Sequence, residues 1–205
     1  MWGEIMNSIN DILANWLEDL NQFSYKDYKD LPDIDLYMDQ VVTFLDKQLS
    51  IFQTSSLDKQ ITSSMINNYV KGEVVSAPIA KKYNREHLAL IQEVCTLKQV
   101  LTIAEVKQII DERYKRDYVQ KDEVFDHFKN LVNEKNKEAI ALTKELLSSI
   151  EPNDLTALTD LSVSLALTAN SFISISKRIL FLNRLYQQDL ENKKKDKSDK
   201  EKSEE

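Results

Sequence analysis

The chain has 205 residues, 42% of them hydrophobic, which is enough to build a core without help from disulfides or metals. Two glycines and three prolines lie far below the usual shares of about 7% and 5%, and this predicts an almost entirely helical fold. The net charge of −7 arises within residues 1–53, which hold 3 basic and 10 acidic side chains, and this counts against nucleic-acid binding by the molecule as a whole.

The first two predicted elements are helices. Apolar residues recur every three or four positions from residue 4 to about 22, which indicates an amphipathic helix, and we take residues 1–30 as this helix and a linker. After Pro32, Asp33 is expected to cap a second helix that runs from Ile34 to about Leu49. Its predicted inner face consists of Ile34, Tyr37, Met38, Val41, Leu45 and Leu49.

A short helix from about Ser64 to Lys71 comes next, with Thr62 or Ser63 as its cap. Gly72 is expected to end it in the left-handed conformation that commonly closes a helix. The segment EVVSAPIAKKY that follows is too short, and too interrupted by Pro78, to be a helix. Its β-branched pairs are typical of a small two-stranded ribbon or of an ordered loop.

Three further helices are predicted before the last one. Asn84 caps the first of them, and Thr102 with Glu105 forms the capping box of the second. The third is a long helical pattern from about Asp117 to Ile150, which Pro152 ends.

The last apolar pattern is the most regular in the chain. It alternates spacings of three and four at Leu158, Leu161, Leu165, Thr168, Phe172, Ile175, Ile179, Leu182 and Tyr186. Such a heptad stripe is typical either of the core of a helical domain or of a homodimer interface, and both interpretations of the C-terminal helical region 116–190 stay open. Residues 191–205 hold no apolar side chain and are expected to form a disordered charged tail.

The short helix before Gly72 has one apolar face and one polar face. The polar face holds Ser64, Asn67, Asn68 and Lys71, without an acid. Asn can pair with the edge of an adenine, while Lys and Ser can bind phosphates; the alternative is an ordinary solvated surface. Downstream, Lys81, Lys82 and Arg85 form the densest basic cluster outside the charged tail.

The order of these features resembles the MerR-type winged helix-turn-helix. MINNYVKGEVV matches the recognition-helix pattern of that family at Ile66, Tyr69 and Gly72, and Lys81 and Tyr83 match the Arg-x-Tyr that ends its wing. The resemblance implies an all-α protein with a MerR-like helix-turn-helix domain over residues 31–115, a short wing, and double-stranded DNA as its partner. The implied DNA-binding residues are Ser64, Asn67, Asn68, Lys71, Lys81, Lys82, Tyr83 and Arg85.

The chain also departs from the MerR pattern. Asn67 stands where that family has a phosphate-contacting arginine, and the wing is shorter. The connection from Leu49 to Thr62 exceeds the usual turn of about three or four residues. A helical interaction module that keeps the winged fold but binds a protein instead of DNA is therefore the alternative function.

A second resemblance is closer. LPDIDLYMDQVVTFLDKQL, MINNYVK and KKYNREHLALI resemble an uncharacterised family of Gram-positive bacteria known as domain of unknown function 1836, over roughly residues 25–115. This kinship implies a MerR-like regulator without defining an activity.

The sequence predicts no enzyme, no catalytic residue, no cofactor and no metal site. It lacks a glycine-rich phosphate loop, a GxSxG elbow and a metalloprotease helix, and the pair Glu123 and His127 would need ligands from another helix to bind a metal. Cys95, the single cysteine, excludes an internal disulfide, is expected in the core and favours a reducing compartment, hence the cytoplasm. No 18 apolar residues run together, so no membrane segment is expected.

Overall fold

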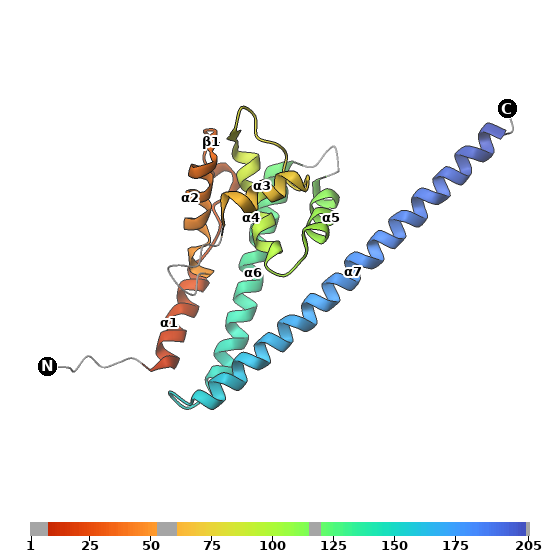
Figure 1. The fold of residues 1–205 in the computed structure, drawn as a ribbon. Coiled ribbons are helices and arrows are strands. Elements are labelled where there is room, and N and C mark those ends of the chain that lie inside the picture. Colours follow the sequence, from red (N-terminus) through yellow and green to blue (C-terminus); the bar gives the residue numbers. More distant parts are fainter. Residues whose placement is uncertain (1–7, 53–60, 115–119, 204–205) are drawn as a thin grey trace.

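The computed structural model describes residues 8–52, 61–114 and 120–203, with side chains up to Lys193. Within these ranges the chain forms seven α-helices, two short 3-10 helices and one two-stranded antiparallel ribbon, which confirms the all-helical expectation (Figure 1). The elements in chain order are α1 Ile9–Gln22, η1 Tyr28–Asp30, β1 Leu36–Tyr37, α2 Met38–Gln48, η2 Ser50–Phe52, α3 Ser63–Lys71, β2 Lys82–Tyr83, α4 Arg85–Lys98, α5 Ile103–Tyr114, α6 Lys121–Leu147 and α7 Leu155–Ser203.

The helices form a head and a stalk, and α6 is shared by both. The head consists of α2 to α5, the ribbon and residues 121–132 of α6, around one large apolar core. Its fully buried side chains include Val41, Leu45, Ile61, Ile66, Leu88, Ile91, Val94, Val106 and Phe125. In the stalk, α1 packs along the second half of α6 through Leu17, Leu20 and Ile140 (Figure 1).

The second helix begins later than the sequence predicts. Tyr37, not Asp33, is its N-cap, because the preceding residues Leu36 and Tyr37 form β1 and pair with Tyr83 and Lys82 of β2. Alternation along this strand buries Leu36 and leaves Tyr37 51% exposed. Ile34, which the helical pattern also assigned to the inner face, is 69% exposed.

The end of α3 shows why a left-handed Gly72 was the wrong expectation. Gly72 has φ −79° and ψ 3°, and the positive φ of 54° falls on the next residue, Glu73. The N–H of Val74 donates to the Tyr69 carbonyl at 2.9 Å and that of Glu73 to the Val70 carbonyl at 3.0 Å. This is the hydrogen-bond pattern of a Schellman motif, with Glu73 where glycine is usual.

Glycine at position 72 answers a packing need instead. A Cβ atom there would lie 3.2 Å from the Asn68 carbonyl oxygen and 3.7 Å from Cγ1 of Ile103. The contact with Ile103 would be an ordinary van der Waals contact, so the tight position is the one against the Asn68 carbonyl in the last turn of α3.

The segment after α3 makes a tight hairpin turn over Ile79–Lys82, with Ala80 and Lys81 at positive φ values of 49° and 64°. The predicted ribbon is present, but its long-range partner strand is β1, which lies before α2, and not a second strand of EVVSAPIAKKY. The ribbon thereby ties the start of α2 to the start of α4.

The last helix, α7, leaves the stalk, passes beside α5 and projects beyond the head (Figure 1). Its backbone continues through residues 191–203, where composition predicts disorder; Lys and Glu are good helix formers, and extending an existing helix is far easier than nucleating one. Over Leu155–Lys193, α7 is also long and apolar enough to cross a membrane, by length and composition alone. Only 6% of its most apolar 18-residue window is buried.

Candidate nucleic-acid interface

The polar face of α3 is held outward by its buried face. Thr62 caps the helix, its Oγ1 accepting the N–H of Met65 at 3.3 Å, as the sequence predicts. Ile66 and Tyr69 are 0% and 3% exposed, so α3 is fixed to the core along one side. All four predicted residues of the opposite side are exposed: Ser64, Asn67, Asn68 and Lys71.

The acid nearest in sequence to this face is compensated by α5. Glu73 follows α3 directly, and Nζ of Lys107 donates to its backbone carbonyl at 2.7 Å and lies 3.9 Å from its carboxylate. Lys107 therefore both caps the turn after α3 and offsets the negative charge there. Sequence reasoning did not single out Lys107, because nothing local marks a contact between residues 34 positions apart.

Two predicted lysines lie on the hairpin. Lys81 is exposed at the turn, while Lys82 is half-buried with Nζ 5.2 Å from the ring centroid of Tyr37. The strand β2 and helix α3 both pack against α2, so the hairpin and the polar α3 face are carried by the same helix.

Tyr83 and Arg85 have structural positions and do not extend the exposed surface. Tyr83 is 3% exposed and packs edge-on against His87, and burial raises the pKa of its hydroxyl. Arg85 lies 2.9 Å from the Asp33 carboxylate and donates through Nε to the Leu31 carbonyl at 3.2 Å. In the structure both side chains make contacts within the head, where Tyr83 is buried and Arg85 is partly buried.

His87 is a further support that the sequence analysis missed. It is 5% exposed, and the N–H of Asn84 donates to its Nδ1 at 3.2 Å. The same Nδ1 lies 2.6 Å from Oδ1 of Asn84, and Nε2 shares a hydrogen bond of 3.1 Å with the Ser76 hydroxyl, which ties the hairpin segment to the start of α4. The Asn84 cap with His87 three residues later was the available signal.

A buried polar cluster joins α4 to α5. The Glu93 side chain is 0% exposed, Tyr114 donates its hydroxyl proton to Oε1 at 2.5 Å, and Arg113 Nε lies 3.5 Å from Oε2. Burial raises the pKa of Glu93 to about 7, against the opposing effects of Tyr114 and Arg113. Cys95 on the same helix is buried as expected, and burial raises the pKa of its thiol to about 12.

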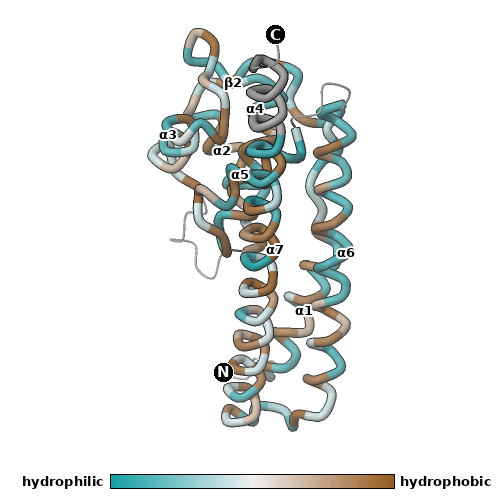
Figure 2. Tube along the Cα trace, turned by 90° about the vertical axis from the view of Figure 1, so that its right-hand side faces the viewer, coloured by the Kyte–Doolittle hydropathy of each residue, from teal (hydrophilic) through white to brown (hydrophobic). Residues whose placement is uncertain are grey.

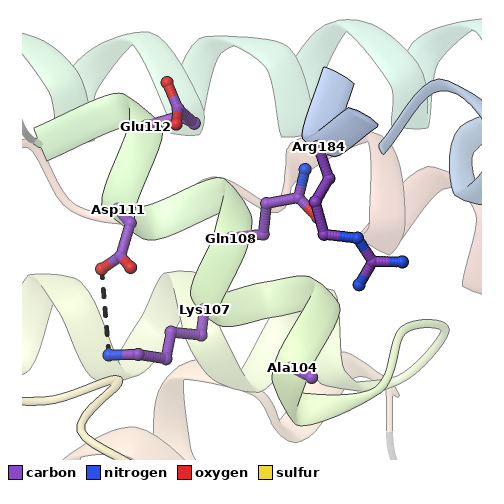
Figure 3. Close-up of a pocket in the computed structure, with 6 residues that line it drawn as sticks. All are labelled: Ala104, Lys107, Gln108, Asp111, Glu112 and Arg184. Carbon is purple, nitrogen blue, oxygen red and sulfur yellow. Dashed lines mark ion pairs between the residues drawn. The ribbon is translucent and has the colours of Figure 1, made fainter. Parts of the chain in front are cut away.

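A hollow between α5 and α7 carries no recognisable chemistry. Figure 3 shows its lining residues Ala104, Lys107, Gln108, Asp111, Glu112 and Arg184. Lys107 lies 4.0 Å from Asp111 in an ion pair, and Gln108 donates to the Leu180 carbonyl at 2.8 Å. In the part of the chain that the structure describes, no three His, Cys, Asp or Glu side chains form a potential metal site.

The protein is all-helical, and its head carries both the two-stranded ribbon and the exposed polar face of α3. The family model described as Domain of unknown function (DUF1836) matches residues 26–131, and the chain belongs to this family. The match covers the head from η1 into α6 and leaves α1 and α7 outside. Neither a curated protein nor a solved structure matches the chain.

Proposed function

We propose that this protein is a cytoplasmic, DNA-binding transcriptional regulator of the MerR-like class. The observation that carries the proposal is the α3 face: four exposed polar side chains, including two adjacent asparagines and one lysine, on an acid-free helix fixed by Ile66 and Tyr69. The excess acidity of the chain lies in residues 1–53, outside this helix.

The order of elements supports the winged helix-turn-helix interpretation. In that interpretation α2 and α3 are the two helices of the motif, the hairpin Ile79–Lys82 is the wing, and α4 with α5 follows it. The long connection between α2 and α3 is the main geometric departure from a usual helix-turn-helix.

The proposed contacts divide by chemistry. Asn67 and Asn68 would read base edges in the major groove, because an Asn side chain can both donate to and accept from adenine. Lys71, Lys81 and Lys82 would bind phosphates, with Ser64 as a neutral phosphate contact. Arg85 would stabilise the ribbon through Asp33 and the Leu31 carbonyl without contacting DNA itself.

One observation favours the alternative, a protein-interaction module. Large apolar side chains are exposed around the ribbon: Ile79 at 74%, Ile34 at 69% and Tyr37 at 51%. A hairpin with an apolar residue beside its turn suits a protein surface better than a phosphate backbone.

Salt dependence separates the two candidates. Duplex DNA binding should weaken steeply as salt rises, since each phosphate contact releases counterions, and removal of one contacting lysine should reduce the log–log slope by about 1. We expect this reduction for Lys71→Ala and for Lys81→Ala in fluorescence anisotropy with a mixed-sequence duplex. Lys137→Ala, which removes an exposed lysine of α6 in the stalk, is the matched control and should leave the slope unchanged. Equal slopes for all three variants would contradict the DNA interface and leave the protein-binding alternative.

A further inference from the structure

The outer half of α7 has two different faces. Towards the head, Gln108 of α5 donates to the Leu180 carbonyl at 2.8 Å, and Lys177 Nζ lies 3.9 Å from the Glu105 carboxylate. Away from the head lies a stripe of large apolar side chains that are 52–68% exposed: Phe172, Ile175, Ile179, Leu182 and Tyr186. We call these five residues the outer stripe. Figure 2 shows hydrophobic positions recurring along α7 as it passes α5.

The outer stripe continues a pattern that is buried where α7 has a neighbour. Leu158 and Leu165 are half-buried and Leu161 is 8% exposed, near the point where α7 turns back from α6. The same alternation of three and four then runs on to Tyr186 without a neighbour. A repeat of 3.5 residues keeps one seam aligned with a second helix over many turns, whereas a single straight helix has 3.6 residues per turn.

The charges around the stripe fit a second copy of this chain. Seven residues flank the heptad stripe along α7, and six of them are uncharged: Ser164, Ala169, Ser171, Ser176, Asn183 and Leu185. The seventh is Arg178. Apart from Arg178, two identical helices can therefore pair along this stripe without bringing like charges opposite one another.

Hydroxyl groups in the heptad stripe and beside it can be buried without losing hydrogen bonds. The Thr168 hydroxyl donates to the Ser164 carbonyl at 2.9 Å, and the Ser171 hydroxyl donates to the Leu167 carbonyl at 3.0 Å. Because these donors are already satisfied within α7, burying them loses no hydrogen bond.

A lipid bilayer fits the same face less well. The uncharged stretch 161–176 has 16 residues (176 − 161 + 1), between Asp160 and Lys177, and a spanning helix needs about 20. Lys177, Arg178 and Arg184 fall within residues 172–186 of the same helix, and a membrane interior would exclude these charges.

We propose that α7 pairs with α7 of a second copy of this protein along the outer stripe, forming a two-helix coiled coil. The inference rests on α7 alone and does not depend on DNA binding. It assigns the exposed apolar side chains of the longest helix to a homodimer interface.

The test is the mass of the full chain in solution, without DNA. We expect light scattering behind size exclusion, or sedimentation equilibrium, to give about twice 23.8 kDa at micromolar concentration. The double variant Ile175→Asp with Ile179→Asp should give 23.8 kDa, with a dissociation constant raised at least about tenfold.

A matched variant keeps the test specific. Val163 and Leu167 are 52% and 62% exposed on α7 but lie off the seam, so Val163→Asp with Leu167→Asp should remain dimeric. Circular dichroism should show the same helix content for both double variants. A wild-type mass of 23.8 kDa up to about 100 µM, or a dimeric stripe variant, would overturn the proposal. Capture of the wild type, but not the stripe variant, by phosphatidylcholine–phosphatidylglycerol vesicles with no dimer in solution would assign the face to a membrane instead.

Discussion

The backbone N–H groups of Ile79 and Lys82 each donate to the other's carbonyl oxygen, at 3.1 and 2.9 Å, and close a two-residue hairpin turn. Both central residues of the turn, Ala80 and Lys81, have positive φ, as a type I′ turn requires. Asn and Gly are preferred there, since the left-handed region costs other residues about 1–2 kcal/mol. Lys81 therefore occupies a position where glycine would be the more stable choice.

Lys81→Gly should raise the free energy of unfolding by about 0.5–1 kcal/mol, because glycine adopts the positive φ without strain. The same change should weaken DNA binding, because it removes a proposed phosphate contact. Urea unfolding and fluorescence anisotropy measure the two effects separately. Lys81→Ala should weaken DNA binding equally without the gain in stability. Loss of stability in the glycine variant would contradict the assigned turn.

Arg85→Ala should lower the stability of the protein and leave DNA binding nearly unchanged, in contrast to Lys81→Gly. It removes an ion pair with Asp33 and the hydrogen bond to the Leu31 carbonyl, so we expect a loss of about 1–2 kcal/mol in the free energy of unfolding. DNA affinity per folded molecule should stay within about twofold of wild type, a difference of about 0.4 kcal/mol. Lys82→Ala provides the contrast, with weaker DNA binding and little change in stability. A stable Arg85→Ala protein with a large loss of DNA affinity would restore Arg85 as a contact residue.

Glu93 should make stability depend on pH. Its pKa in the folded protein is about 7, above the ordinary value of 4.5, so the unfolded chain releases this proton first as pH rises. Protonated Glu93 therefore contributes fully to the free energy of unfolding below pH 4.5. This contribution is lost between pH 4.5 and 7, where the free energy of unfolding falls by up to about 1.4 kcal/mol per pH unit.

Glu93→Gln removes this titration while leaving an oxygen to accept the hydroxyl proton of Tyr114. The variant should gain stability relative to wild type as pH rises from 5 to 8, as measured by urea unfolding at each pH value. Glu112→Gln, at an exposed position of α5, should follow the wild-type profile. Parallel profiles for wild type and Glu93→Gln would show that Glu93 is ionised throughout this range.

Three helix caps were predictable from the sequence, whereas the expected Asp33 cap and left-handed Gly72 were wrong. The caps at Thr62, Asn84 and Thr102 depend on side chains within three residues, and the structure has all three. The shift of positive φ from Gly72 to Glu73 was missed because glycine can also suit a position with little space, here beside the Asn68 carbonyl.

The candidate site also has a part that was predictable from local sequence and a part that depends on long-range contacts. The two-sided nature of α3 follows from its helical period, and its polar side chains are exposed as expected. The roles of Tyr83 and Arg85 depend on partners far away in the sequence: β1 pairs with β2, and Asp33 lies 52 positions before Arg85. A basic residue beside an aromatic one has the same appearance in the sequence whether it faces a phosphate or a carboxylate.

The most direct test of the central claim, that the polar face of α3 reads DNA, is selection of bound fragments from a genomic library. Wild type and Asn67→Ala should be compared at the same salt concentration, since non-specific binding varies strongly with salt. Wild type should enrich one sequence motif, and Asn67→Ala should lose preference at one base position of it, at a cost of about 1–3 kcal/mol. Enrichment of no motif by the wild type, or of an identical motif by both proteins, would contradict the claim.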